Sequence, residues 1–270
     1  QMSNRATLIV ANWKMHLKVT QSLALVEKLG KHTKPGRNIQ VVLCPAVSAT
    51  GVVKLYMEAH EIDFALGVQN VNEHDEGAYT GEVSVAMVRD IAKYAICGHS
   101  ERRIHYGETS KRVAAKVAAC VRNGVRPILC VGEDLIERES GHGKRRVLDQ
   151  LRVGLSLTPR SEAHKVVVAY EPVWAISTTK HARHADPRDI EPMLRAIRHE
   201  LEELYGEEIG AEAQILYGGS VDSHNAGAYL RLDDCKGLLV GSASLNWAEF
   251  SAIVDAADAD GSRQKVVHAV

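Results

Sequence analysis

Short apolar segments that alternate with helical segments restrict the possible folds of this chain more than any other feature of its sequence. Eight segments rich in apolar and β-branched residues are predicted to be buried strands: residues 7–11, 39–44, 62–68, 94–97, 125–131, 166–170, 213–217 and 237–240. Segments with helical character lie between most of them, such as 22–30, 110–123 and 187–205. Because parallel strands need crossover connections of this kind, the order predicts a series of βα units.

Eight βα units in 270 residues match the size of a (β/α)₈ barrel, which typically has about 250 residues. The alternative is an open, doubly wound sheet, which often carries a GxGxxG turn after its first strand. No such turn follows residues 7–11, and Gly218 and Gly219 come only after the seventh segment. We therefore predict an α/β, single-domain (β/α)₈ barrel over residues 1–270, with outer helices and a C-terminal tail that frays from about residue 257.

The composition excludes several classes of function. The formal net charge is −1, which provides no electrostatic attraction to nucleic acid or to an anionic membrane surface. No apolar run approaches the ~20 residues of a membrane span, and residues 1–20 lack the long apolar region of a signal peptide. The five cysteines are scattered and odd in number, which favours reduced thiols. We expect a cytoplasmic protein that binds neither nucleic acid nor membranes.

Polar residues that follow the predicted strands are the candidates for chemistry, because the active sites of (β/α)₈ barrels lie at the carboxyl ends of the strands. Glu171 follows the sixth segment and precedes Pro172, which directs the chain outward, so its carboxylate is a candidate general base. Lys14 follows the first segment and would neutralise an anionic substrate. His99 follows the fourth, beside a predicted N-cap at Ser100, and a helix N-terminus lowers the pKa of an imidazole. Taken singly, each also fits an ordinary structural role at a strand end or surface.

Two glycine-rich turns follow the last two predicted strands, YGGSV at 217–221 and VGSASL at 240–245. Glycines let an anion approach backbone N–H groups, and the frequent phosphate site of (β/α)₈ barrels lies at these two loops. The base, the lysine, the histidine and this phosphate cradle are all expected at one end of the barrel. Glu101 is a candidate ion-pair partner that would hold Lys14 in place.

Six stretches of the chain, taken in order and spacing, resemble the triosephosphate isomerase family over nearly the full length. They are ANWKMH (11–16), AYTGE (78–82), GHSERR (98–103), AYEPVWAI (169–176), YGGSV (217–221) and LVGSASL (239–245). The resemblance implies a TIM barrel that interconverts D-glyceraldehyde 3-phosphate and dihydroxyacetone phosphate through an enediolate, in glycolysis and gluconeogenesis. It implies no metal and no organic cofactor.

The resemblance also implies roles for individual residues. Glu171 would move the proton between two carbons, His99 would hydrogen-bond the carbonyl and enediolate oxygens, and Asn12 and Lys14 would stabilise negative charge. This pairing of a glutamate base with a neutral histidine is the established chemistry of the family. The stretch that begins at Pro172 would be a lid. The remaining implied residues are the phosphate-binding N–H groups of Ser177, Ser220, Gly241 and Ser242, and the supporting residues Glu101 and Tyr217.

The family is usually a homodimer, and the resemblance implies that this chain is one as well. The loop 69–82 would insert into the partner subunit and bring Thr80 close to the partner's active site. The expected ligand is a small phosphorylated triose.

The chain departs from the family pattern at several positions. Residues 177–179 read Ser-Thr-Thr where the lid usually has Gly-Thr-Gly, which removes easy access to positive φ. Ser242 replaces a usual glycine but keeps its N–H, and Lys236 replaces a common aspartate for no functional reason that we can give. His181 and His184 lie in a segment that is longer than usual and would need a third ligand to hold a metal.

Other functions stay open at this point. An isomerase of a four-carbon ketose phosphate, such as an erythrulose phosphate, would use the same glutamate, histidine and lysine but need more room near the lid and phosphate turn. A catalytically silent barrel retained for binding or assembly is the alternative from another class, although every expected catalytic side chain is present. A Schiff-base aldolase needs a desolvated lysine, whereas Glu101 would keep Lys14 charged.

Overall fold

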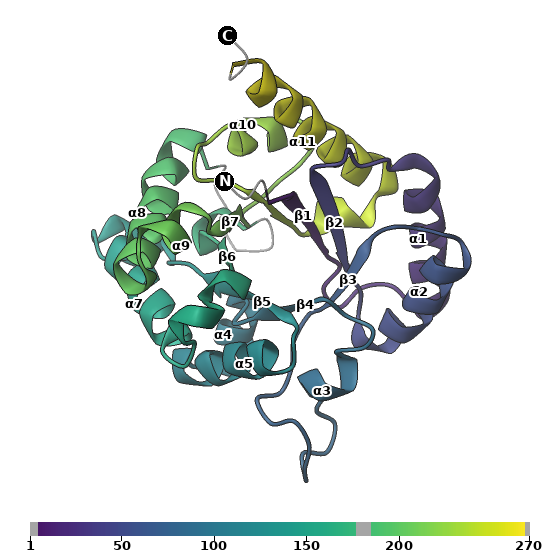
Figure 1. The fold of residues 1–270 in the computed structure, drawn as a ribbon, viewed down its shortest axis with the longest axis horizontal. Coiled ribbons are helices and arrows are strands. Elements are labelled where there is room, and N and C mark those ends of the chain that lie inside the picture. The colour runs from purple at the N-terminus through teal and green to yellow at the C-terminus, as the bar shows by residue number, and fades with distance from the viewer. Residues whose placement is uncertain (1–4, 177–184, 268–270) are drawn as a thin grey trace.

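Eight parallel strands close into a barrel in the order β1 to β8, as the sequence predicts. The computed structural model describes residues 5–176 and 185–267 (Figure 1). Closure is made by β1, which pairs with both β2 and β8. The strands are β1 Thr7–Asn12, β2 Ile39–Cys44, β3 Ala65–Val68, β4 Tyr94–Cys97, β5 Arg126–Val131, β6 Val167–Tyr170, β7 Gln214–Tyr217 and β8 Gly237–Val240.

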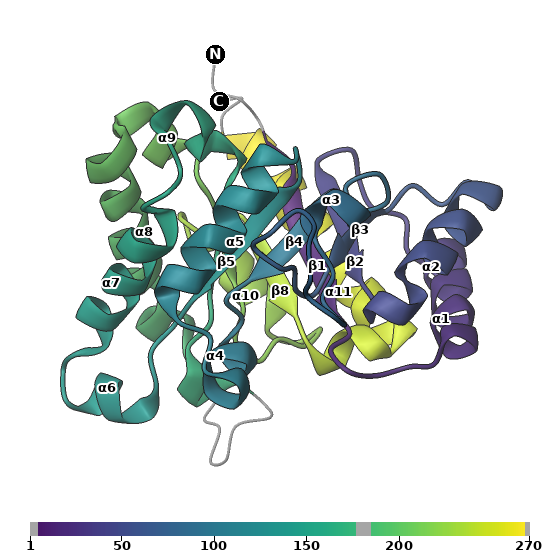
Figure 2. The ribbon, with the colours of Figure 1, turned by 90° about the horizontal axis from the view of Figure 1, so that it is seen from below.

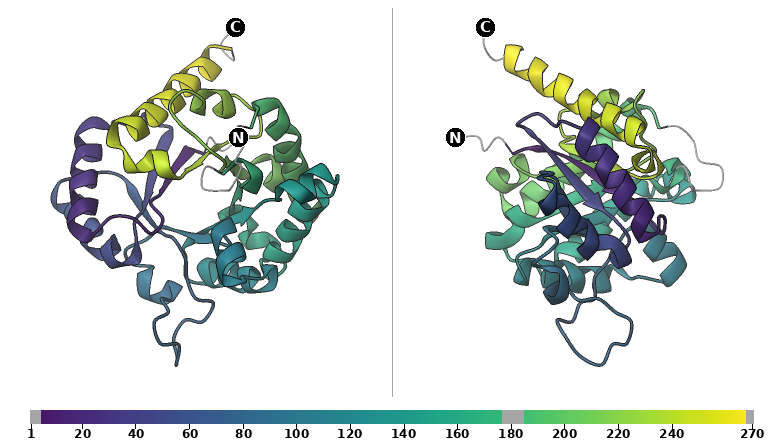
Figure 3. Two further views of the ribbon diagram at one scale, coloured as in Figure 1. Left: turned by 180° about the vertical axis from the view of Figure 1, so that it is seen from behind. Right: turned by 90° about the vertical axis from the view of Figure 1, so that its right-hand side faces the viewer.

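Helices surround the barrel on its outside, as the views from below and from behind show (Figures 2 and 3). The α-helices are α1 Val19–His32, α2 Val47–Ala59, α3 Val85–Val88, α4 Ser100–Tyr106, α5 Ser110–Arg122, α6 Leu135–Glu139, α7 Gly143–Leu155, α8 Pro187–Tyr205, α9 Glu207–Ala211, α10 Ala226–Leu230 and α11 Trp247–Val267. The described residues also form the 3₁₀ turns η1 Arg160–Lys165, η2 Val173–Ala175 and η3 Ser242–Leu245. The loop between β3 and α3 projects away from this ring of helices (Figure 1).

The strands read as continuous apolar runs because each contributes to two separate cores. Leu8 and Val10 belong to the smaller core, which fills the inside of the barrel. Ile9 and Ala11 belong to the larger one, which packs the barrel against the helices. Because both faces are buried, both are predominantly apolar, which is the physical basis of the strand prediction.

The third strand is shorter than predicted. It begins at Ala65, whereas the apolar run begins at Ile62. Ile62 packs against α1 instead. Its side chain lies so close to Gly30 of that helix that a Cβ added to the glycine would be 2.6 Å from the Ile62 Cδ1. Apolar character alone does not distinguish a residue that pairs in the sheet from one that packs under a helix.

Helix termini follow local capping rules at several places. Helix α8 begins with Pro187 in its first turn, and the Asp186 side chain accepts a hydrogen bond from the Arg188 N–H at 2.9 Å. Helix α11 continues to Val267, past the residue near 257 from which the sequence predicts fraying of the tail. That fraying stays a prediction. In the described ranges, no helix is long and apolar enough to cross a membrane. All five cysteines are buried and unpaired.

A buried ion pair ties helix α5 to the chain before it. The ammonium of Lys116 on α5 is buried, and it contacts the Glu108 carboxylate and the Asn70 Oδ1, the latter at 2.7 Å. We expect Glu108→Ala to lower the free energy of unfolding by about 3–5 kcal/mol, because it leaves the Lys116 charge buried without a carboxylate. Urea denaturation measures this loss. The double variant Glu108→Leu/Lys116→Met should recover part of it, and a change within about 0.5 kcal/mol for Glu108→Ala contradicts the assignment.

Candidate active site

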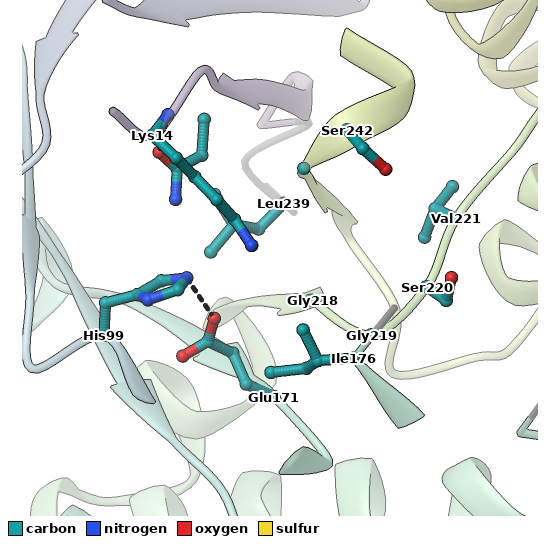
Figure 4. Close-up of a pocket in the computed structure, with 12 residues that line it drawn as sticks. Lys14, His99, Glu171, Ile176, Gly218, Gly219, Ser220, Val221, Leu239 and Ser242 are labelled. Carbon is teal, nitrogen blue, oxygen red and sulfur yellow. Dashed lines mark hydrogen bonds and ion pairs between the residues drawn. The ribbon is translucent and has the colours of Figure 1, made fainter. Parts of the chain in front are cut away.

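A pocket lies at the carboxyl ends of the strands, with about 400 Å³ of empty space that includes solvent at its open mouth. Its lining comes from the carboxyl ends of β1 and β8 and from the segments that follow β1, β4, β6, β7 and β8, so residues far apart in the sequence share one cavity (Figure 4). The sequence-predicted residues that it brings together are Asn12, Lys14, His99, Glu171, Ser220, Gly241 and Ser242.

Glu171 is the buried carboxylate at the centre of the site. It follows β6, and its backbone N–H donates to the Val131 carbonyl at 2.8 Å. The backbones of Gly132 and Glu171 pack closely together, because a Cβ added to Gly132 would lie 1.8 Å from the Glu171 carbonyl oxygen. The carboxylate is 2% exposed, with Oε1 2.8 Å from His99 Nε2 and Oε2 accepting from the Ser100 N–H at 3.0 Å. Figure 4 shows the two side chains pointing toward one another.

His99, and not Ser100 as predicted from the sequence, is the N-cap of α4. Its Nδ1 accepts the Glu101 N–H at 3.3 Å, whereas the Ser100 hydroxyl makes no hydrogen bond with the described residues. An unprotonated imidazole nitrogen can cap a helix as a serine oxygen does. With Nδ1 as an acceptor, the neutral ring carries its proton on Nε2, which then donates toward Glu171.

The two buried groups shift each other's pKa. Burial lowers the pKa of His99, but the charge and hydrogen bond of Glu171 outweigh it, so the pKa of the imidazole is raised. Burial raises the pKa of Glu171, but the charge and hydrogen bond of His99 and the Ser100 N–H outweigh it, so the pKa of this carboxyl is lowered. The predicted lowering of the His99 pKa is therefore wrong for this arrangement. The nearby carboxylate dominates over the helix N-terminus.

Lys14 reaches the pocket from a strained backbone position. Its φ of +52° is in the left-handed region, which is uncommon for a residue other than glycine. The Asn12 Oδ1 accepts its N–H at 3.0 Å, and the Gln69 side chain donates to its carbonyl at 2.8 Å. Its Nζ lies 2.7 Å from the Glu101 Oε1, which confirms the predicted ion pair. Sequence reasoning missed Gln69, although it directly follows β3 and the same strand-end rule points to it.

The predicted phosphate cradle is only partly free to bind an anion. The N–H groups of Gly241 and Ser242 donate no hydrogen bond to the described part of the chain. The Ser220 N–H, in contrast, donates to the Ala175 carbonyl at 3.0 Å. Ser177 lies outside the described residues. An anion would gain two N–H donors directly and a third only if Ala175 moves away.

Other predicted residues lie around the pocket. The Tyr217 ring is buried beneath the β7 turn, where a Cβ on Gly219 would lie 2.1 Å from its hydroxyl oxygen. Thr80 is exposed in the projecting loop and does not line the pocket. Ile176, Val221 and Leu239 line it but were not predicted, because apolar residues beside a strand end look like ordinary core.

Sequence reasoning also missed Glu133, which holds the start of the segment after β6. Its Oε1 accepts the Tyr170 hydroxyl and the Trp174 indole N–H, both at 2.9 Å. Burial raises the pKa of this carboxyl above its ordinary value. In the described ranges, no group of three or more His, Cys, Asp and Glu side chains is placed to hold a metal ion. His181 and His184 lie outside those ranges.

The arrangement joins a carboxylate, an imidazole, an ammonium and free backbone N–H groups in one cavity. Such a set can move a proton next to a carbonyl while holding an anionic substrate. It defines the class of protein: a (β/α)₈-barrel enzyme built for proton transfer on a small anion.

Comparison with known proteins identifies the family within this class. The family model described as triosephosphate isomerase matches residues 7–257. A triosephosphate isomerase of Leifsonia xyli subsp. xyli is 42% identical over 93% of this chain and 96% of its own length. A triosephosphate isomerase of Carboxydothermus hydrogenoformans is 42% identical over 93% of this chain and 98% of its own length. One of Saccharopolyspora erythraea is 41% identical over 92% of this chain and 95% of its own length. The chain belongs to the triosephosphate isomerase family and is an isomerase.

The coupling of Glu171 and His99 is open to direct measurement. We expect the pKa of His99 to fall in Glu171→Gln, because burial, which lowers it, is then no longer opposed by the nearest negative charge. A pH titration of the His99 ring followed by NMR in the ligand-free protein measures the shift. Glu101→Gln removes a carboxylate 3.6 Å from Nδ1 and should produce a smaller fall. An unchanged titration in Glu171→Gln would contradict the coupling.

Proposed function

We propose that the chain interconverts D-glyceraldehyde 3-phosphate and dihydroxyacetone phosphate. Membership of the family supports this reaction, and the placement of Glu171, His99 and Lys14 around one pocket carries the assignment of residues. The reaction moves a proton between adjacent carbons through an enediolate. It therefore needs a base, a donor to the carbonyl oxygen and a compensating positive charge.

Glu171 is the proposed base. Its lowered pKa keeps it ionised at neutral pH, as a group that accepts a proton from carbon must be. When Glu171 takes the proton, the electron pair of the broken C–H bond passes to the substrate's oxygen, so the negative charge moves from the carboxylate to the enediolate. In the ligand-free site it is held by His99 and Ser100, so binding of substrate has to replace those hydrogen bonds.

His99 is the proposed donor to the substrate's oxygen atoms. The Glu101 N–H occupies its Nδ1, which leaves the Nε2 proton free to donate once Glu171 turns to the substrate. A neutral imidazole matches the basicity of an enediolate better than an imidazolium does, which is the family's established use of this residue. Lys14 and Asn12 would stabilise the negative charge that develops.

The phosphate is proposed to bind the N–H groups of Gly241 and Ser242 first, with Ser220 and Ser177 completing the site. Release of the Ser220 N–H by Ala175 would couple phosphate binding to movement at the start of the segment after Pro172. That segment is the proposed lid, which would exclude water and suppress loss of phosphate from the enediolate. This chemistry uses only side chains and backbone groups of the chain. We place it in one catalytic domain of a cytoplasmic protein.

A coupled assay that follows formation of dihydroxyacetone phosphate tests the proposal. We expect the unsubstituted protein (the parent) to have a kcat/KM that approaches the diffusional ceiling of ~10⁸ M⁻¹s⁻¹. Glu171→Gln should lose about 10²–10⁴-fold in activity, mainly in kcat, because the amide cannot accept the proton. An erythrulose phosphate serves as the comparison substrate. Higher kcat/KM on it would contradict triose specificity, and an inactive but folded parent would contradict the isomerisation itself.

We further propose that the chain is a homodimer formed through the loop 69–82. The loop projects from the barrel (Figure 3), and Tyr79 and Thr80 within it are exposed. Its base is held in shape by an Asn72–Glu82 hydrogen bond at 2.8 Å. Next to the active-site lysine, Met15 is 93% exposed and lines a surface cavity of about 710 Å³, measured in the same way as the active-site pocket. A matching loop from a partner would cover this apolar side chain.

Thr80→Arg tests the dimer. The side chain is exposed in the single chain, so a bulky charge there should leave the fold intact and disfavour only a contact with a partner. We expect the variant to sediment as a monomer at concentrations where the parent sediments as a dimer, with kcat/KM reduced at least about tenfold. Thr80→Ser is the matched control and should behave as the parent. A parent that is monomeric at all concentrations would contradict the dimer.

A further inference from the structure

Tyr229 links two parts of the site region that are far apart in the sequence. It lies on α10 and is 1% exposed. Its hydroxyl donates to the Ala185 carbonyl at 2.5 Å. Ala185 is buried and directly precedes Asp186, the N-cap of α8, so this hydrogen bond fixes the backbone where α8 is entered.

The same side chain supports the turn that follows β7. The Tyr229 ring stacks on Tyr217, with ring centroids 4.0 Å apart and an interplanar angle of 26°. Tyr217 in turn lies in contact distance of Gly219, where any side chain would collide with its hydroxyl. Tyr229 therefore contacts both the backbone at Ala185 and the aromatic ring beneath the proposed phosphate turn.

The helix that carries Tyr229 is tied to this turn by its own hydrogen bonds. Asn225, the residue before α10, donates from Nδ2 to the Ser220 carbonyl at 3.2 Å. Its Oδ1 accepts the Asp222 N–H at 2.9 Å. These hydrogen bonds hold the start of α10, and with it Tyr229, next to Ser220. The hydrogen bond from the Tyr229 hydroxyl then holds the Ala185 backbone relative to the same turn.

We propose that Tyr229 is a positioning residue that orders the phosphate turn and the entry to α8 as one unit before the ligand binds. The inference rests on the proposed function for the identity of the ligand, a phosphate ester. A turn that is already ordered loses less conformational entropy on binding, so the effect falls on affinity more than on chemistry. No atom of Tyr229 lines the pocket, which separates this role from a catalytic one.

Tyr229→Phe tests the proposal, because it keeps the stacked ring and removes the hydroxyl that donates to the Ala185 carbonyl. We expect KM for glyceraldehyde 3-phosphate and the inhibition constant of inorganic phosphate to rise roughly three- to tenfold, with kcat changed less than twofold, about the effect of one hydrogen bond. Steady-state kinetics with phosphate as competitor measures all three quantities.

Tyr205→Phe is the matched control. The Tyr205 hydroxyl is likewise buried and donates to two backbone carbonyls, those of Leu155 at 3.2 Å and Thr158 at 3.1 Å. No atom of Tyr205 lines the active-site pocket. Thermal unfolding should show comparable destabilisation of both variants, whereas only Tyr229→Phe should weaken binding.

The two proposals fail in different ways. If both variants change KM and phosphate inhibition equally, or neither changes them, Tyr229 has only a structural role and the inference is overturned. If the parent has no isomerase activity, the proposed function fails, and calorimetric titration with inorganic phosphate still compares the two variants. Weaker phosphate binding in Tyr229→Phe alone would then support the positioning role by itself.

Discussion

Closure of the sheet between β1 and β8 is the constraint on which the rest of the structure depends. All eight strands are parallel, so closure brings every carboxyl end to one rim of the barrel. Asn12 at the end of β1, His99 after β4 and Glu171 after β6 meet there because of this geometry. The apolar core inside the barrel fills the space beneath them and keeps water from that side.

Electrostatic balance at this rim is maintained by a short chain of charged groups. Glu171 faces His99, whose other nitrogen lies 3.6 Å from the Glu101 carboxylate, and that carboxylate pairs with Lys14. Each buried or half-buried charge has a partner, without which its desolvation would be too costly. A substrate that enters must replace some of these contacts, so the ligand-free site is a stable arrangement that binding rearranges.

Much of the fold was predictable because the physical rules involved are local. Apolar runs identified all eight strands, and the N-terminal residues of α5 and α8 were correctly placed at Ser110 and Pro187. The prediction was wrong at Ile62, which packs under α1, and at the α4 cap, where His99 takes the place expected for Ser100. In both cases two local roles were equally open, and packing against distant residues decided between them.

The sequence by itself determined which residues stand at the strand ends, and therefore the polar side chains that line the pocket. The tertiary structure decided how those members interact. It raised the pKa of His99, engaged the Ser220 N–H with Ala175, and brought Gln69 and Tyr229 into supporting positions. These outcomes depend on distances of a few ångströms between residues far apart in the chain. Local sequence patterns carry no information on such distances, because residues far apart in the chain come close together only when the barrel closes.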